Sequence, residues 1–368
     1  LDYIYTHGDE SNGASTFNIS STLGGLVNAN YTVTTVTPSA GGSDRESIES
    51  IRFNAPLTFT AQNRAVTSDD YRAIILKSFA NVSSISTWGG EDNDPVDFGK
   101  VYVAVKPLTA ATLTPAEKLT IKDTVLKGKN IVSITPEIVD PNFTNLELDV
   151  FFKYNPNLTD RTNVELQGVV RDTISDYNFN NLNKFDGVFR YSQILKAIDS
   201  ADRSILNSTI RPYMFQTISA KTTRDLNNFN LTYASGIFES GSEKEFILNS
   251  TAFKIGGVDH YLGDKVVTGS SNRTIIVYKI VEGANITVIN NAGSIEASTG
   301  RVIINNFAVD TNTDIKVTVI PNSLDIAPKR DQLLNIDQTY VSITAEVDTI
   351  STAGASGSID YTTNSRLR

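Results

Sequence analysis

The stretch "RAVTSDDYRAIIL", residues 64–76, bears on both the fold and the function of the chain. Two adjacent carboxylates, Asp69 and Asp70, follow the hydroxyls of Thr67 and Ser68. Such a cluster could supply the acid and base of an active site, and it could equally begin a helix. The choice between these interpretations goes far toward deciding whether the chain is an enzyme.

The residues after this cluster favour the helix. Apolar side chains recur at helical spacing and form one face, made of Tyr71, Ile74, Ile75 and Phe79. Thr67 suits the N-cap, where its hydroxyl accepts a backbone N–H, and Asp70 three residues later completes a capping box. Both aspartates also lie near the positive end of the helix dipole. The sequence therefore predicts a structural role for this pair, and we do not expect it to be catalytic.

A second capping box begins the segment "TLTPAEKLTIKDTVLKGKN", residues 112–130. Thr114 is the N-cap, Pro115 takes the first helical position and Glu117 the third. Gly128 suits the position after the helix C-terminus, where a left-handed backbone is common. The segment predicts a helix with well-defined ends.

Strands surround these helices. Residues 51–67 show no period and are interpreted as an extended arm. Farther along, strands over 99–107, 131–139, 145–154 and 203–215 alternate with helices over about 161–177 and 191–198. In the strand at 145–154, apolar and charged side chains take opposite faces. This alternation predicts helices packed on a sheet.

After about residue 230 the helical periods end. Short β segments lie between Gly, Asn and Asp residues, at 245–255, 273–281, 284–290, 300–307, 314–321 and 340–347. The segment "NNAGSIEASTG", residues 290–300, is interpreted as a hairpin-bearing loop. The fold class is therefore α+β and multidomain. The predicted parts are a loose or β lead-in (1–48), an α/β domain (49–228), a β-rich domain (229–348) and a mobile tail (349–368).

Composition limits the functions that the chain can have. Its 368 residues carry a net charge of −9 and no basic run, which argues against nucleic-acid binding. No apolar run is long enough to span a membrane. There is no cysteine, and the two histidines, His7 and His260, are expected in exposed loops. The chain opens on Leu1 and is interpreted as part of a longer protein.

Dedicated chemical sites are not expected. The acidic segment "GGEDNDPVD", residues 89–97, could offer oxygen ligands to calcium but lacks the EF-hand spacing, and a solvated turn is favoured. No phosphate-binding loop or nucleophile elbow occurs. We therefore predict no catalytic, cofactor-binding or metal-binding residues, and no cofactor.

Three segments in order carry a resemblance to a known family: "ESIRFNAPLTFTAQNRAVTSDDYRAIIL", "WGGEDNDPVDFGKVYVAVKP" and "LTPAEKLTIKDTVLKGKNIVSITPEIVDP". Their landmarks are Arg52, Pro56, Arg64, Thr67, Asp70, Tyr71, Gly89, Gly90 and Glu91. Over residues 49–215 the chain resembles the baseplate J-like family of contractile-tail phages, and it is similar to the baseplate wedge proteins of T-even-type contractile-tail bacteriophages. The β-rich part carries no hallmark of this family.

The resemblance implies a structural virion protein without enzymatic activity. Such a subunit would be assembled in the host cytoplasm into the tail baseplate wedge. It would dimerise, contact other wedge proteins, link wedges into a ring around the tail tube and take part in the conformational change on infection. The partners implied are a second copy and other wedge proteins, not nucleic acid or membrane.

Two alternatives stay open. A tail or cell-surface adhesin would bind glycans through the β-rich domain and would need an exposed aromatic platform, whereas the lone Trp88 is expected in a turn outside that domain. A polysaccharide-cleaving enzyme would need two suitably spaced carboxylates. Independently, sparsely charged segments such as "TIIVYKIV" predict open strand edges and a homodimer through the β-rich domain.

Overall fold

The computed structural model describes residues 10, 14, 16, 48–79, 81–93, 95–108, 110–222, 227–239, 246–267 and 273–349. Almost all of the predicted lead-in, His7 and nearly all of the predicted tail lie outside these residues. The chain divides into two units, Leu1–Pro141 and Asn142–Arg368, which are described separately.

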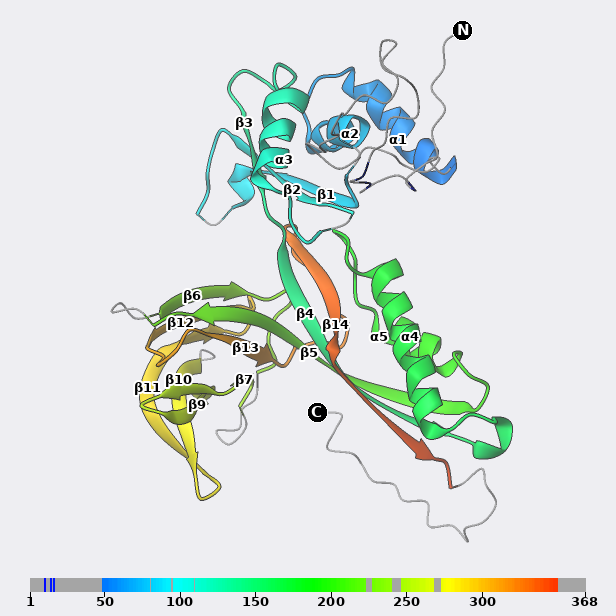
Figure 1. The fold of residues 1–368 in the computed structure, drawn as a ribbon. Coiled ribbons are helices and arrows are strands. Elements are labelled where there is room, and N and C mark those ends of the chain that lie inside the picture. The colour runs from blue at the N-terminus through cyan, green and yellow to red at the C-terminus, as the bar shows by residue number, and fades with distance from the viewer. Residues whose placement is uncertain are drawn as a thin grey trace, which may run out of the picture. The chain divides into compact units, whose positions relative to one another are not determined.

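The first unit combines short helices with a small sheet (Figure 1). Its helices are α1 (Ile48–Ala61), α2 (Ser68–Ser78) and α3 (Pro115–Thr120), the last continued by a wider π-helical turn η2 (Ile121–Val125). Its strands are β1 (Ser84–Gly89), β2 (Lys100–Lys106) and β3 (Thr135–Val139), with a 3-10 turn η1 (Gly90–Asp92) after β1. The central strand β2 pairs antiparallel with β1 and parallel with β3.

The core of this unit forms where the predicted apolar face of α2 meets the sheet. Tyr71, Ile74 and Ile75 are buried and cluster with Val103 and Val105 of β2. The helix therefore begins where its capping box predicts, and its apolar face packs inward.

The predicted extended arm is wrong over most of its length, because residues 48–61 form α1. Helical periods reveal a helix only when one face is buried. In α1, Ile48 and Phe59 are 69% and 82% exposed, so no such period appears in the sequence. Pro56 lies inside the helix and also suggested extended chain. Figure 1 shows α1 beside α2.

The second unit contains two sheets. The five-stranded sheet has the order β14-β4-β5-β13-β7. Its strands are β4 (Asn142–Tyr154), β5 (Ile205–Ala220), β7 (Leu248–Ser250), β13 (Thr313–Val319) and β14 (Gln332–Val347). Two helices, α4 (Asn163–Asn181) and α5 (Tyr191–Asp199), lie along it after a 3-10 turn η3 (Pro156–Leu158).

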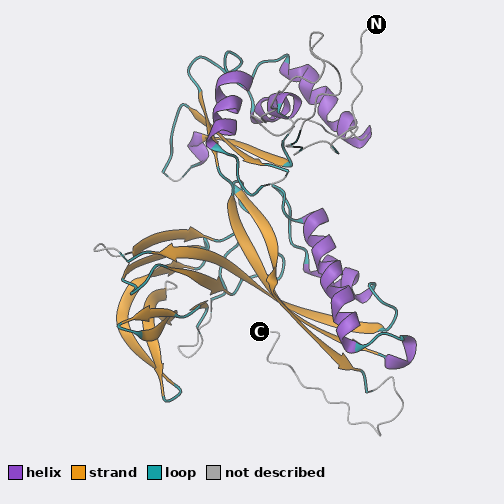
Figure 2. Cartoon of the chain, viewed as in Figure 1, coloured by secondary structure: helices purple, strands orange, loops and turns teal. Residues whose placement is uncertain are grey.

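The six-stranded sheet has the order β6-β12-β11-β10-β9-β8 and is curled (Figure 2). Its strands are β6 (Asn227–Thr232), β8 (Phe253–Ile255), β9 (Val258–Val266), β10 (Arg273–Val281), β11 (Ala284–Glu296) and β12 (Arg301–Phe307). The predicted α+β class is confirmed, with helices on one sheet and a β-rich C-terminal region.

The two sheets share one apolar core. The predicted inner face of β4 is buried, and Leu148 and Phe152 on it cluster with Leu166 and Val170 of α4. The same cluster extends to Val277 of the curled sheet. Alternating burial along β4 therefore joins the helices and strands of this unit.

Three strands from the predicted β-rich domain, β7, β13 and β14, complete the sheet of the predicted α/β domain. The edge strand β14 pairs parallel with β4, and β13 pairs antiparallel with β5. The predicted domain boundaries at 228/229 and 348/349 stay a prediction. The sheet itself is assembled from both sides of residue 229.

The segment at 290–300 does carry a hairpin, because β11 and β12 pair antiparallel on either side of its turn, but more than half of it is strand and not loop. Residues 290–296 continue β11, and only 297–300 form the turn into β12. Gly293 adopts a φ of +138°, and a Cβ there would overlap the carbonyl oxygen of Ile303. Glycine allows this close approach, and it also conceals the strand in the sequence.

Candidate functional site

The carboxylates of the opening stretch cap helix α2. The Thr67 hydroxyl accepts the Asp70 N–H at 3.3 Å, and Asp70 Oδ2 accepts the N–H groups of Thr67 at 2.8 Å and Val66 at 3.1 Å. Burial acts to raise the pKa of Asp70, but these hydrogen bonds outweigh it and lower the pKa. The hydrogen bonds of Asp70 are therefore those of a helix cap, and the predicted capping box is confirmed.

Two further capping boxes follow the same arrangement. Glu117 and Thr114 form the one predicted at the start of α3. Thr162 and Glu165 form another at the start of α4, and the hydrogen bond from the Thr162 N–H lowers the pKa of Glu165. Sequence reasoning began this helix near Arg161 and missed the box, although the Thr-x-x-Glu spacing was its signal.

Two polar side chains of the acidic segment at 89–97 bond to residues close by in the chain. Asp97 pairs with Lys100 at 2.9 Å and accepts the Tyr102 hydroxyl at 2.7 Å. Asn93 accepts the indole N–H of Trp88 at 2.7 Å. Over the residues that the structure describes, no group of three or more His, Asp or Glu side chains is placed to hold a metal ion.

Trp88 lies in strand β1 and not in the predicted turn. Its side chain is 9% exposed, and its ring stacks on Tyr102 with centroids 5.8 Å apart. The following Gly-Gly pair suggested a turn, but the turn begins only after Gly89. A buried indole cannot serve as an exposed platform for sugars.

His260 is buried in strand β9, so the prediction of an exposed loop is wrong for this histidine. It is 4% exposed, its Nδ1 lies 2.8 Å from the Val258 carbonyl oxygen, and its ring contacts Phe253. The flanking glycines suggested a turn, but that turn ends at Gly257. Phe253 on the paired strand β8 covers the imidazole, a contact that the sequence did not reveal.

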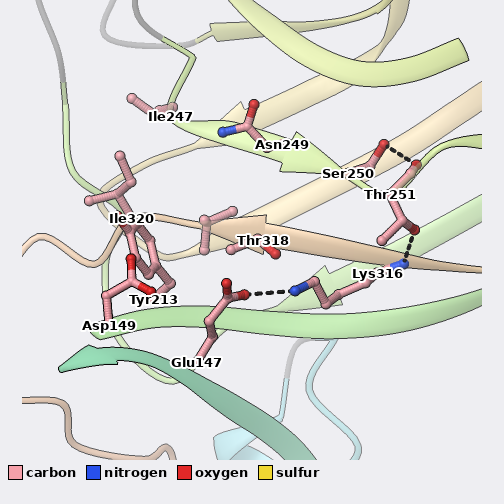
Figure 3. A pocket seen from close by; sticks show the side chains of 11 residues that line it. Glu147, Asp149, Tyr213, Ile247, Asn249, Ser250, Thr251, Lys316, Thr318 and Ile320 are labelled. Carbon is pink, nitrogen blue, oxygen red and sulfur yellow. Dashed lines mark hydrogen bonds and ion pairs between the residues drawn. The ribbon is translucent and has the colours of Figure 1, made fainter. Parts of the chain in front are cut away.

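A hollow of about 490 Å³ lies on the five-stranded sheet (Figure 3). It is lined by Glu147, Asp149, Tyr213, Ile247, Asn249, Ser250, Thr251, Lys316, Thr318, Val319 and Ile320. Lys316 pairs with Glu147 at 2.7 Å, and its ammonium lies 3.7 Å from the centroid of the Tyr340 ring. The cation of this hollow is thus held by a carboxylate and an aromatic ring, and it braces strands β4, β13 and β14.

A buried ion pair connects the two sheets. Asp264 of β9 and Arg273 of β10 are 0% and 3% exposed, and they bond to each other. The other oxygen of Asp264 accepts the N–H groups of Ile247 and Leu248, each at 2.9 Å, at the start of β7. Burial raises the pKa of Asp264, while these donors and Arg273 lower it, and the raising effect is larger. Asp264 thus connects β7, the edge strand of the five-stranded sheet, to the curled sheet.

No helix among the described residues is both long enough and apolar enough to cross a membrane. The polar groups of the capping boxes, of the acidic segment at 89–97 and of the Asp264–Arg273 pair contribute to helix caps, turns and contacts between the sheets.

Two family descriptions match the chain in succession. Residues 67–139 match the baseplate structural protein gp6, C-terminal domain I, and residues 142–217 match C-terminal domain III. The resemblance predicted from the sequence is confirmed, and the chain is similar to the gp6-like phage baseplate structural proteins.

A particular relative is the baseplate wedge protein gp6 of Enterobacteria phage T4. The chain is 28% identical to it over 322 residues, which cover 84% of this chain and 44% of that protein. The chain therefore spans less than half the length of this relative. A cryo-EM structure of the anti-feeding prophage (AFP) baseplate, 6-fold symmetrised, matches 48% of this chain and 39% of that chain at 16% identity, with a TM-score of 0.33.

Proposed function

We propose that the chain is a structural subunit of a phage tail baseplate wedge. In this role it dimerises, links neighbouring wedges into a ring around the tail tube, and takes part in baseplate assembly and in the conformational change on infection. Its partners are a second copy and other wedge proteins. It is assembled in the host cytoplasm and resides in the virion.

One observation carries this proposal. Two successive segments, residues 67–139 and 142–217, match two gp6 C-terminal domains in order. A match of consecutive domains is more specific than a single shared motif, and the T4 relative is itself named a wedge protein. Capping, packing and ion pairing account for the polar sites described above, and this fits an assembly role.

Electron microscopy of the chain purified with neighbouring wedge proteins tests the proposal. We expect wedges or rings that contain the chain. Light scattering of the chain alone should give about twice the 40.1 kDa monomer mass at micromolar concentration. Isolated monomers that join no assembly but bind glycans would contradict the proposal and favour the adhesin.

The proposal also excludes turnover. Glycan, ester, peptide and phosphodiester substrates should give only background rates, because Asp70 is engaged in a cap and Glu147 in an ion pair. The opposing result is a saturable rate that a single Asp or Glu substitution abolishes.

A further inference from the structure

The β10–β11 hairpin projects beyond its neighbours in the curled sheet, as the yellow ribbon in Figure 1 shows. Strand β9 pairs with β10 only from Arg273 to Tyr278, and β12 pairs with β11 only from Gly293 to Glu296. The hairpin continues past both to a two-residue turn, Glu282 and Gly283, where both φ angles are positive. Residues 279–292, called the hairpin arm below, thus extend beyond the strands on either side.

Exposed aliphatic side chains lie along most of the arm, whereas Ala292 at its end belongs to the core cluster and Ile289 packs against that cluster. The exposed ones are Ile280 (53%), Val281 (44%), Ile286 (46%) and Val288 (46%). Val281 lies on the same face of β10 as the fully buried Ile275 and Val277, because alternate strand residues share a face. Lys279 interrupts this face, and the apolar pattern of the core resumes at the exposed Val281.

The outer edge of β11 is open as well. Residues 284–287 and Ile289 pair with β10 on one side, bulges interrupt the ladder at 288 and at 290–292, and no other described strand pairs with residues 284–292. Proteins usually protect such an edge with charged side chains, prolines or short strands. This one, "ANITVINNA", contains no charge and no proline. Its bulges lie at 288 and 290–292, so the paired run 284–287 beside the turn is not bulged.

We propose that the hairpin arm is a self-association edge, on which β11 pairs antiparallel with β11 of a second copy. This inference rests on the self-association in the proposed function and names the element responsible for it. A two-fold axis brings each residue near the axis against its own copy or a close neighbour, so any charge there would meet a like charge. The neutral edge meets this requirement, and the exposed Ile286 and Val288 supply apolar contacts across the axis.

Charge substitution on the intact chain tests this proposal. Ile286→Lys and Ile286→Glu, each alone, should weaken self-association at least about tenfold, because each places like charges across the axis. An equimolar mixture of the two variants should associate again as a mixed dimer. Sedimentation or light scattering over a concentration series measures all three. Val258→Lys is the matched control, since Val258 is 49% exposed in the same sheet but outside the arm.

The outcomes separate the two proposals. A strictly monomeric wild type would overturn both self-association and the hairpin arm. A wild-type dimer that both Ile286 variants leave unchanged would overturn the arm alone, as would equal weakening by Val258→Lys. If an Ile286 variant fails to fold, hydrogen exchange of the wild type decides: the amides of 284–292 should be protected more at high than at low protein concentration, and unchanged exchange overturns the arm.

Discussion

Thr67 and Asp70 exemplify how single polar residues act in this chain. An aspartate that could be a catalytic acid instead accepts the backbone N–H groups of Val66 and Thr67, directly before the helix. Asp264 does the same for the start of β7, although it is buried. At the residue scale, carboxylates stabilise ends of elements and junctions between them.

The cap of α2 should have a measurable effect on stability. Thr67→Ala should lower the free energy of unfolding by about 1 kcal/mol, because the hydroxyl that accepts the Asp70 N–H is lost. Asp70→Asn should cost less, about 0.3–1 kcal/mol, since the charge near the helix N-terminus is lost. Denaturant melts measure both, and Asp69→Asn, which removes a charge near the helix N-terminus but keeps the capping box, separates the dipole effect from the cap. Wild-type stability in both variants would mean that the cap contributes nothing.

Substitution in the Asp264–Arg273 pair should lower the free energy of unfolding more than loss of the α2 cap does. Asp264→Asn removes the negative charge opposite a buried guanidinium, and removing one member of a buried pair costs about 3–5 kcal/mol. Thermal and denaturant unfolding should both shift strongly. Asp259→Asn, at an exposed position of the same strand, should have little effect. A change below about 1 kcal/mol for Asp264→Asn would show that the pair is not a tight link between the sheets.

At the scale of elements, the capping boxes of α2 and α3 share one chemistry. Their carboxylates, Asp70 and Glu117, have pKa values below the ordinary 3.8 and 4.5, because hydrogen bonds to the ionised form outweigh burial. A lowered folded-state pKa contributes stability above the unfolded value, and this contribution is lost as pH falls through the folded value. The helix starts should therefore weaken in acid and not in base.

This pH dependence predicts that the difference in stability between wild type and Asp70→Asn changes with pH. The stability advantage of wild type over Asp70→Asn should be full near about pH 6 and should shrink below about pH 4, where the wild-type carboxylate becomes protonated. Chemical denaturation at both pH values measures it. An advantage that stays constant, or grows in acid, would contradict the role of the ionised form.

At the scale of the molecule, the second unit is closed by strands far apart in the chain. Strand β14 pairs with β4, and Asn335 bonds to Asn145, 190 residues away. Leu333, Leu334 and Ile336 of β14 are buried. A chain that ended near residue 225 would lack both β13 and β14. The effect of such a truncation on self-association could therefore not be separated from damage to the five-stranded sheet.

A shorter truncation tests this closure. A chain ending at Asp331 should lose the cooperative unfolding of the second unit, because β4 would lose a parallel partner and an apolar cover. A chain ending at Asp348 keeps β14 and is the matched control. Calorimetry should show a lowered or broadened transition only for the shorter chain. The same transition in both would mean that β14 is dispensable.

The amino-acid sequence by itself determined the local features. The caps at Thr67 and Thr114 and the alternation along β4 depend on residues a few positions apart, so their pattern is complete in the sequence. Sequence motifs in order also predicted the baseplate resemblance. Only the tertiary structure decided that residues 48–61 are helical, that His260 is buried under Phe253, and that β14 joins β4. These features depend on partners that local periodicity does not specify, since a strand's apolar pattern tells which face is buried but not which distant strand lies beside it.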